Sequence, residues 1–221
     1  MTTQSYLELT DDDIERASGK LLREFFATCG GEITVPVPVE RIAEKFLGYR
    51  IEITDQGLFA DPEFLGGVDF HAETILVNAS VENHNGRYAF TIAHELGHHV
   101  LHRAHFLSRQ TEGEKKIMCR SSAKRPMIEY QADRFAAALL MPTEELEEAA
   151  RRLSRKFRAK QGSKALATRL IAEGGFSNVS LEAMRYRLRE LKISANPLML
   201  PRLLYIPSLL LYRLMRYLLR R

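Results

Sequence analysis

Apolar residues recur at helical spacing in two stretches of the chain. In residues 87–102 they form one broad stripe that no proline interrupts: Phe90, Ile92, Ala93, Leu96, Val100 and Leu101. In residues 128–142 they form a second stripe, which Pro142 closes: Ala132, Phe135, Ala136 and Leu139. A stripe of this period is typical of an amphipathic helix. We therefore expect two helices, each with one buried face.

The rest of the chain mixes helical and strand-like patterns. Helical spacing predicts a first helix from Thr10 to about Cys29, a second over residues 37–46, and two more that begin near Thr143 and Ser180. Short apolar runs predict strands at residues 50–53, 66–70 and 75–78, and the polar stretch 106–127 is typical of a surface loop. Short strands among many helices predict the α+β class.

Composition excludes several classes of protein. The chain has 221 residues, of which 45% are apolar, enough for a substantial core. Residues 1–17 are polar and acidic and do not resemble a signal peptide, so we expect no export. Cys29 and Cys119 are the only cysteines, too few for a disulfide scaffold. We expect a reducing cytoplasm and interpret Cys119 as a buried or idle thiol, with a regulatory thiolate on a bound metal as the alternative.

Charge is segregated along the chain. Residues 151–169 hold eight basic residues and residues 191–221 hold six, with no acid in either stretch. The remainder holds 18 basic against 28 acidic residues, although the whole chain has a net charge of +4. An acidic body is a poor general nucleic-acid binder, so we expect no direct nucleic-acid binding. The basic segments leave local contacts with nucleic acid, an acidic partner or a membrane surface open.

Two histidines on the first of the two helices are placed to hold one metal ion. His94 and His98 are four residues apart, so their side chains lie on one face, one turn from each other. Glu95 follows the first histidine, where its carboxylate can act as general base towards a water activated by the metal. The pattern also arises by chance on surface helices, but the apolar surroundings disfavour this reading, because buried polar groups need partners. Gly97, unfavourable inside a helix, predicts that something large lies close to the backbone there.

A catalytic zinc site needs a third protein ligand and an open position for water. The metzincin pattern is excluded, because Leu101 and Ala104 stand where that pattern has its glycine and its third histidine. His102 is a further full turn beyond His98, and we expect that it would reach back to the metal only under strain.

Glu129 and Asp133 on the second helix are better candidates. They are one turn apart on one face, the spacing by which gluzincin-type peptidases place a ligand glutamate and an aspartate that accepts the other N–H of a ligand histidine. The alternative is that both are solvent-facing acids paired with Arg134 or a nearby lysine.

Two segments resemble the ImmA/IrrE family of bacterial and phage metallopeptidases. Residues 90–98 read Phe-Thr-Ile-Ala-His-Glu-Leu-Gly-His, and residues 129–142 read Glu-Tyr-Gln-Ala-Asp-Arg-Phe-Ala-Ala-Ala-Leu-Leu-Met-Pro. Weaker similarity extends the resemblance over about residues 35–193. It implies a zincin-like metallopeptidase core with a small twisted sheet, an active-site helix and a helical C-terminal half.

The resemblance also implies a function and a ligand set. The function is that of a cytoplasmic zinc endopeptidase that cleaves a helix-turn-helix repressor in a mobile-element or stress response. The site implied is Zn²⁺ held by His94, His98 and Glu129, with Glu95 as the catalytic base and Asp133 behind a ligand. Two other functions stay open: a regulatory sensor that binds a repressor without cutting it, and a membrane-surface scaffold whose zinc is structural.

Within this frame the chain divides into three parts: a metallopeptidase core at residues 1–142, a helical subdomain at 143–193 and a basic apolar tail at 194–221. In zincin-like folds a strand of the small sheet borders the cleft and pairs, at an exposed edge, with an extended substrate. We expect Gly66, Gly67, Val68, Asp69 and Phe70 to have this role, with an ordinary hairpin as the alternative. The oxyanion donor is open among three candidates: Tyr88, His99 and Tyr130.

The tail departs from the family core. Its longest uncharged run is Leu203 to Tyr212 and contains Pro207, whereas a spanning helix needs about 20 apolar residues. In residues 208–221, arginines recur at helical spacing beside leucines, a pattern typical of an interfacial helix. Peripheral contact with the inner membrane surface is therefore one expectation. Folding back on the body, or a dimer contact, is the other.

Overall fold

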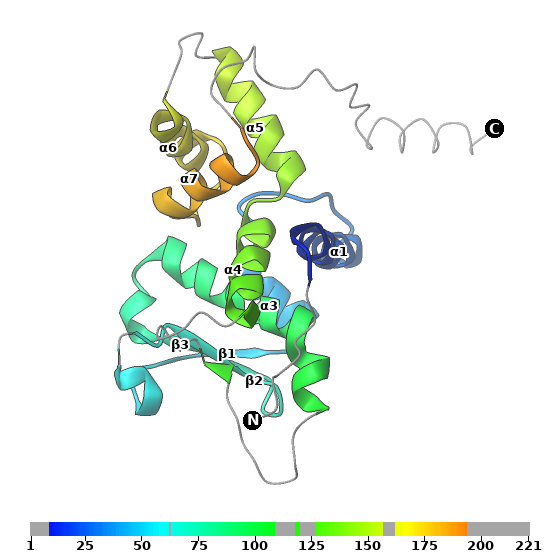
Figure 1. The fold of residues 1–221 in the computed structure, drawn as a ribbon, viewed down its shortest axis with the longest axis vertical. Coiled ribbons are helices and arrows are strands. Elements are labelled where there is room, and N and C mark those ends of the chain that lie inside the picture. Colours follow the sequence, from blue (N-terminus) through cyan, green and yellow to red (C-terminus); the bar gives the residue numbers. More distant parts are fainter. Residues whose placement is uncertain (1–8, 62, 109–117, 120–126, 157–161, 194–221) are drawn as a thin grey trace, which may run out of the picture.

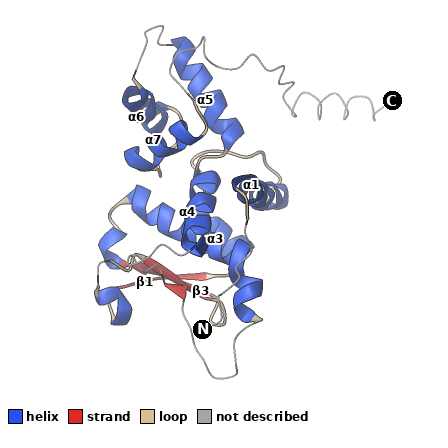
Figure 2. Cartoon of the chain, in the orientation of Figure 1, coloured by secondary structure: helices blue, strands red, loops and turns tan. Residues whose placement is uncertain are grey.

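The computed structural model describes residues 9–61, 63–108, 118–119, 127–156 and 162–193. In this part of the chain a small sheet lies at one end, the last three helices lie at the other, and two long helices lie between them (Figure 1). The architecture is α+β, as the sequence predicts. Figure 2 shows how small the strand content is beside the helices.

The sheet has four strands in the order β1-β3-β2-β4. Their bounds are Arg50–Thr54 for β1, Gly66–Asp69 for β2, Thr74–Asn78 for β3 and Met118–Cys119 for β4. β1 runs parallel to β3, whereas β2 runs antiparallel to both of its neighbours, with Gly67 opposite Leu76 on one side and Cys119 on the other. The expected substrate strand is therefore an inner strand of the sheet, bordered by β4.

This arrangement corrects the expectation of an exposed edge at residues 66–70. Val68 and Phe70 are buried in the core, and Phe70 packs edge-to-face on Phe106 with ring centroids 5.3 Å apart. Asp69 accepts the backbone N–H groups of His71 and Ala72, so its side chain shapes the hairpin turn. A substrate strand can pair at Gly67 and Val68 only in place of β4. The substrate role of β2 stays a prediction.

α3 (Asn85–Leu107) and α4 (Met127–Leu140) form the centre of the fold. α3 contacts β2 and β3 through its buried face, and α4 packs along α3 and against α1 (Asp11–Thr28). α1 begins with a capping box, in which the Thr10 hydroxyl accepts the backbone N–H of Asp13 and the Asp13 carboxylate accepts that of Thr10. Because such a box satisfies two otherwise unpaired N–H groups, α1 begins where the sequence predicts.

The segment predicted as one helix over residues 37–46 is divided. A single turn, α2 (Val39–Arg41), leads into a wider π-type turn, η1 (Ile42–Phe46). Two short 3-10 turns, η2 (Gly57–Ala60) and η3 (Ala79–Val81), connect the strands. The wider turn leaves Val39, Ile42 and Ala43 fully buried, so the apolar pattern is satisfied by packing even though the helix is irregular.

The last three described helices are α5 (Thr143–Lys156), α6 (Ser163–Glu173) and α7 (Leu181–Glu190). Ser180 caps α7, its hydroxyl accepting the N–H of Ala183, as the sequence predicts. Arg187 of α7 has no exposed surface and reaches the Met141 carbonyl, Thr143 and the carboxylates of Glu15 and Glu190. One continuous hydrophobic core runs from Ile14 to Ile193.

The tail at 194–221 lies outside the described residues, so its predicted membrane or dimer contact stays a prediction. In the described part of the chain, no helix has both the length and the apolar character needed to cross a membrane.

Candidate metal centre and active site

The face of α3 that carries His94 and His98 is buried. Each of the two residues is 1% exposed, and their Nε2 atoms lie 3.0 Å apart because they are one helical turn from each other. The two imidazoles therefore point at one position. Such convergence is what a pair of metal ligands requires.

Glu129 of α4 completes the group. Its Oε2 lies 3.2 Å from His94 Nε2, and its Oε1 lies 3.3 Å from His98 Nε2. The three residues are all buried, and their donor atoms lie within 4.8 Å of one another, so the group can hold a metal ion. The alternative of two solvent-facing acids paired with Arg134 is wrong, because Glu129 is 6% exposed and Arg134 is bound instead by Asp11 and Glu190.

Close contact between α3 and α4 brings Glu129 over the histidines. A methyl group on Gly97 would come within 3.1 Å of the Ala132 Cα and 3.2 Å of the Phe135 Cβ. A side chain at residue 97 would therefore push α4 away from α3. This is the close approach that the glycine predicts.

Asp133 lies behind the group. Its Oδ1 is 3.0 Å from Nδ1 of His94 and accepts the N–H there, which leaves the Nε2 lone pair for a metal ion. Burial opposes a charged His94, but the hydrogen bonds with Asp133 and Glu129 outweigh it and raise the pKa of His94 to about 9. Asp133 lies at Nδ1 of this imidazole and Glu129 lies at Nε2. The two carboxylates that favour a charged imidazole also favour a metal cation at Nε2.

A second hydrogen-bonded chain orients His98. His102 Nε2 lies 2.9 Å from the Oε1 atom of Gln131, and His102 Nδ1 lies 3.0 Å from His98 Nδ1. Because the amide oxygen accepts, His102 carries its proton on Nε2, and its Nδ1 accepts the Nδ1–H of His98. Burial lowers the pKa of His102 and lowers that of His98 to about 4, so both rings are neutral at pH 7. His98 Nε2 is then unprotonated and ready to bind a metal.

The carboxylate of Glu129 is held in its charged form. Burial would raise its pKa, but the hydrogen bonds from His94 and His98 outweigh this and lower the pKa of Glu129 far below its usual range. An ionised carboxylate between two imidazoles is a donor set that suits a first-row divalent metal.

Glu95 lies beside the metal group, against the start of β2. A methyl group on Gly66 would come within 2.9 Å of Glu95 Oε1 and 2.4 Å of the Thr91 methyl carbon. Glu95 is 1% exposed and Thr91 is 4% exposed. The strand thus approaches α3 closely at the carboxylate predicted to be the base, and only glycine at residue 66 leaves room for both side chains.

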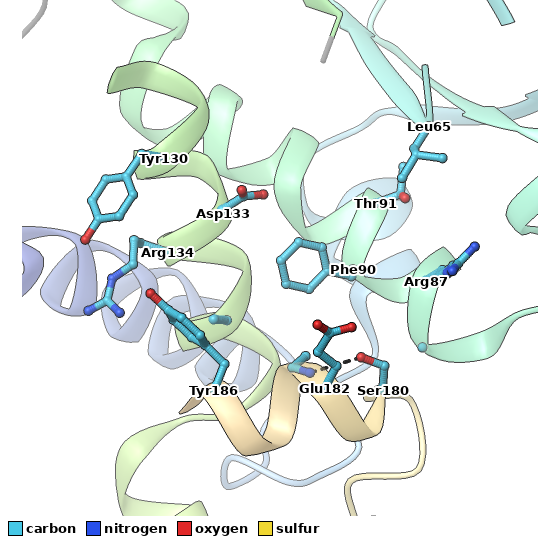
Figure 3. Close-up of a pocket in the computed structure, with 13 residues that line it drawn as sticks. Leu65, Arg87, Phe90, Thr91, Tyr130, Asp133, Arg134, Ser180, Glu182 and Tyr186 are labelled. Atoms are coloured by element: carbon cyan, nitrogen blue, oxygen red, sulfur yellow. Dashed lines mark hydrogen bonds between the residues drawn. The ribbon is translucent and has the colours of Figure 1, made fainter. Parts of the chain in front are cut away.

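A cavity of about 560 Å³ lies next to the metal group (Figure 3). Its walls come from the first half of α3, the middle of α4, the start of α7 and Leu65 before β2. Asp133 and Thr91 lie in the wall nearest the metal group. The volume lies within the range of about 300–1,000 Å³ that is usual for ligand sites.

The three candidate oxyanion donors face other parts of the structure. The Tyr130 hydroxyl donates to Asp11 on α1, and His99 Nδ1 lies 2.8 Å from the Tyr49 hydroxyl. Burial, with Glu40 and Glu44 nearby, raises the pKa of Tyr88. The structure therefore favours none of the three as the donor.

Sequence reasoning missed the pair of His102 and Gln131. The signal was present, because His102 is one turn beyond His98 on the same face of the helix. Its position suggests a metal ligand, whereas its geometry is that of a group that orients one. No local pattern points to Gln131, which reaches His102 only because α4 packs on α3.

Comparison with protein families shows that the Peptidase M78 family model, described as the IrrE N-terminal-like domain, matches residues 47–189. Comparison with curated proteins gives no significant match. Among solved structures, a Mycobacterium tuberculosis transcriptional regulator is similar at 19% identity with a TM-score of 0.49, over 89% of this chain and 49% of that one. The chain thus spans about half the length of that regulator.

Proposed function

The chain belongs to the Peptidase M78 family, and from this premise we propose that it is a zinc-dependent endopeptidase that cleaves a helix-turn-helix repressor or a similar regulatory protein. The family and the buried group of His94, His98 and Glu129 support a metallopeptidase. The resemblance of residues 90–98 and 129–142 to ImmA/IrrE proteins is the ground for the substrate class.

The spacing of the donor atoms supports zinc as the metal. Two ligands that each lie about 2.0–2.1 Å from a tetrahedral ion are about 3.3 Å apart. Here the three donor pairs are 3.0, 3.2 and 3.3 Å apart. Two imidazoles and one carboxylate are also the ligand set of several catalytic zinc sites, which keep the fourth position open.

When bound, zinc supplies a Lewis acid that lowers the pKa of water and polarises the peptide carbonyl. The protein residues do the rest. The Glu95 carboxylate accepts the proton of the attacking water, and the same carboxyl group then returns a proton to the amine that leaves. Asp133 and His102 hold the two imidazoles in the tautomers and orientations in which both Nε2 atoms face the site. Gly66 has no side chain and therefore leaves room for the Glu95 carboxylate beside β2.

The observation that carries the proposal is the position of Glu95. It is buried beside the two histidines, yet His94, His98 and Glu129 already form a complete set of three ligands without it. A structural zinc site needs no such carboxylate, whereas a hydrolytic site needs a base.

The test is Glu95→Gln, which keeps the size of the side chain but cannot accept a proton. The variant should fold, keep its zinc, and lose peptidase activity by several orders of magnitude. Wild type and Glu95→Gln are each co-expressed with the helix-turn-helix regulator whose gene lies nearest to the gene of this protein. Wild type should shorten that regulator at one bond, and Glu95→Gln should bind it and leave it whole.

The alternative hypothesis, a sensor that binds a repressor without cutting it, predicts a different result. If Glu95→Gln relieves repression as well as wild type does, and the regulator stays full length with both, the protein acts by binding. The peptidase proposal then fails for that partner.

A further inference from the structure

The cavity beside the metal group has a distinct chemistry. Phe90 of α3 projects into it, and Tyr130 of α4 and Tyr186 of α7 line its far side (Figure 3). The two tyrosines are 39% and 53% exposed, so their rings present apolar surface to whatever enters. Such a surface accommodates the methylene stem of a long side chain.

Most of the charge around the cavity is already compensated. Arg134 is bound by Glu190 and, at 3.0 Å, by Asp11. Asp133 is held at 3.0 Å by His94. Arg87 is exposed, and its side chain extends away from Phe90 in Figure 3. Arg134 and Asp133 therefore add little net charge to the space between α3 and α7, and the charge of Arg87 lies away from Phe90.

Glu182 is different. It lies in the first turn of α7, and its carboxylate points towards Phe90 in Figure 3. Among the residues that the structure describes, no basic side chain lies within ion-pair distance of it. Glu182 therefore places an exposed carboxylate, without an ion-pair partner in the described chain, beside the aromatic rings of the cavity. Lysine and arginine match this combination, because a cation is attracted both by a carboxylate and by aromatic faces.

The cavity also borders the reacting centre. Asp133 in its wall binds a metal ligand, and Thr91 in its wall lies one turn before Glu95 on the same helix. A side chain that enters this space belongs to a residue close to the bond that is cut. The cavity is thus placed to select among substrate sequences.

We infer that the cavity is a substrate subsite that takes a lysine or arginine side chain, with Glu182 as its counter-ion. The cleavage specificity rests on the proposed peptidase function, whereas the binding preference does not require cleavage. Glu182 is a specificity-determining residue in this scheme, and Phe90 and Tyr186 hold the stem of the basic side chain.

The first experiment measures binding without cleavage. Full-length, zinc-loaded Glu95→Gln protein is passed over pools of random synthetic peptides in which one position is fixed as lysine, glutamate or leucine. Retention of the lysine pool should exceed that of the glutamate pool by about tenfold, the factor that one charge-assisted contact supplies. In the Glu95→Gln protein, a second substitution Glu182→Gln should remove this preference for lysine over glutamate, and Glu182→Lys should reverse it. Adding Glu148→Lys, a charge reversal at an exposed position of α5, should change nothing.

Reversal of the preference separates recognition from a merely structural role of Glu182, since a less stable α7 would weaken the retention of all pools alike. Equal retention of the three pools would overturn the inference. So would a preference that survives Glu182→Lys.

The second experiment separates this inference from the proposed function. Wild type and Glu182→Lys are incubated with the same pools, and the cut bonds are identified by mass spectrometry. Cleavage with a basic residue at one constant position in wild type, lost in Glu182→Lys, supports both. Cleavage without that dependence overturns the subsite and leaves the peptidase. No cleavage, together with charge-dependent retention in the first experiment, overturns the peptidase and supports the subsite.

Discussion

His102 Nδ1 accepts the Nδ1–H of His98 at 3.0 Å, while its Nε2–H donates to Gln131 at 2.9 Å. These hydrogen bonds form a chain from the Gln131 amide on α4, through the buried imidazole of His102 on α3, to the metal ligand His98. Each hydrogen bond determines the tautomer of the next ring, so that His98 presents a lone pair to the metal site. His94 receives the equivalent support from a carboxylate, Asp133.

From these hydrogen bonds we predict that His102→Leu weakens zinc binding by about 10- to 100-fold, the usual effect of removing a partner of a metal-bound histidine. The reason is that His98 then loses the acceptor that orients its ring. Competition with a chromophoric chelator measures the affinity, and His84→Ala, at an exposed position before α3, is the control. Unchanged affinity would reduce His102 to a core residue. Complete loss of zinc from His102→Leu, with full zinc content in Glu129→Ala, would instead make His102 the third ligand.

Gly66→Ala should lower kcat by up to about 100-fold while zinc stays bound, because the added methyl displaces Glu95 and Thr91 from their positions. Thr91→Ser in the same protein should restore part of the activity, since it removes the nearer of the two clashes at 2.4 Å. Cleavage assays and zinc content are measured together. Gly162→Ala is the matched control, because a methyl group there has no neighbour within 4 Å. Full activity of Gly66→Ala would mean that β2 moves freely from α3.

Arg187→Met should destabilise the protein by about 3 kcal/mol, since it leaves Glu15 without its buried partner and leaves Glu190 with Arg134 alone. The figure is at the low end for a buried pair because the Glu15 side chain is 29% exposed. Urea unfolding measures the loss, and Arg185→Met, an exposed change on the same helix, should have little effect. If Arg187→Met has the stability of wild type, the buried ion pairs do not hold α7 to α1.

Removal of the metal should lower the melting temperature. A ligand at about 100 times its Kd stabilises the folded state by about 2.7 kcal/mol, which corresponds to roughly 5–10 °C for a chain of this size. The physical reason is that the three ligands come from two helices, α3 and α4, which the metal cross-links. Differential scanning calorimetry before and after chelation measures the shift, and added zinc should reverse it. Glu95→Gln should show the full shift, and a shift that persists in His94→Ala would place the metal elsewhere.

The sequence by itself determines those features that depend on local geometry. His94 and His98 face one site because any helix places residues four apart on one side. Glu129 and Asp133 are paired for the same reason, and Thr10 and Ser180 cap helices through bonds to residues three positions away. Even the contact between the metal helices is signalled locally, by Gly97 in an otherwise apolar helix.

Only the tertiary structure decides which distant segments meet. No periodicity indicates that Gln131 reaches His102, that β4 borders β2, or that Arg187 lies between Glu15 and Glu190. The exposed edge expected at residues 66–70 is instead paired with β4, because the free side of a strand depends on pairing with residues about 50 positions further along the chain. The cavity that carries Glu182 exists only where α3, α4 and α7 come together. Such contacts depend on how whole elements pack, and that is determined by the shape of the shared core rather than by the pattern within any one segment.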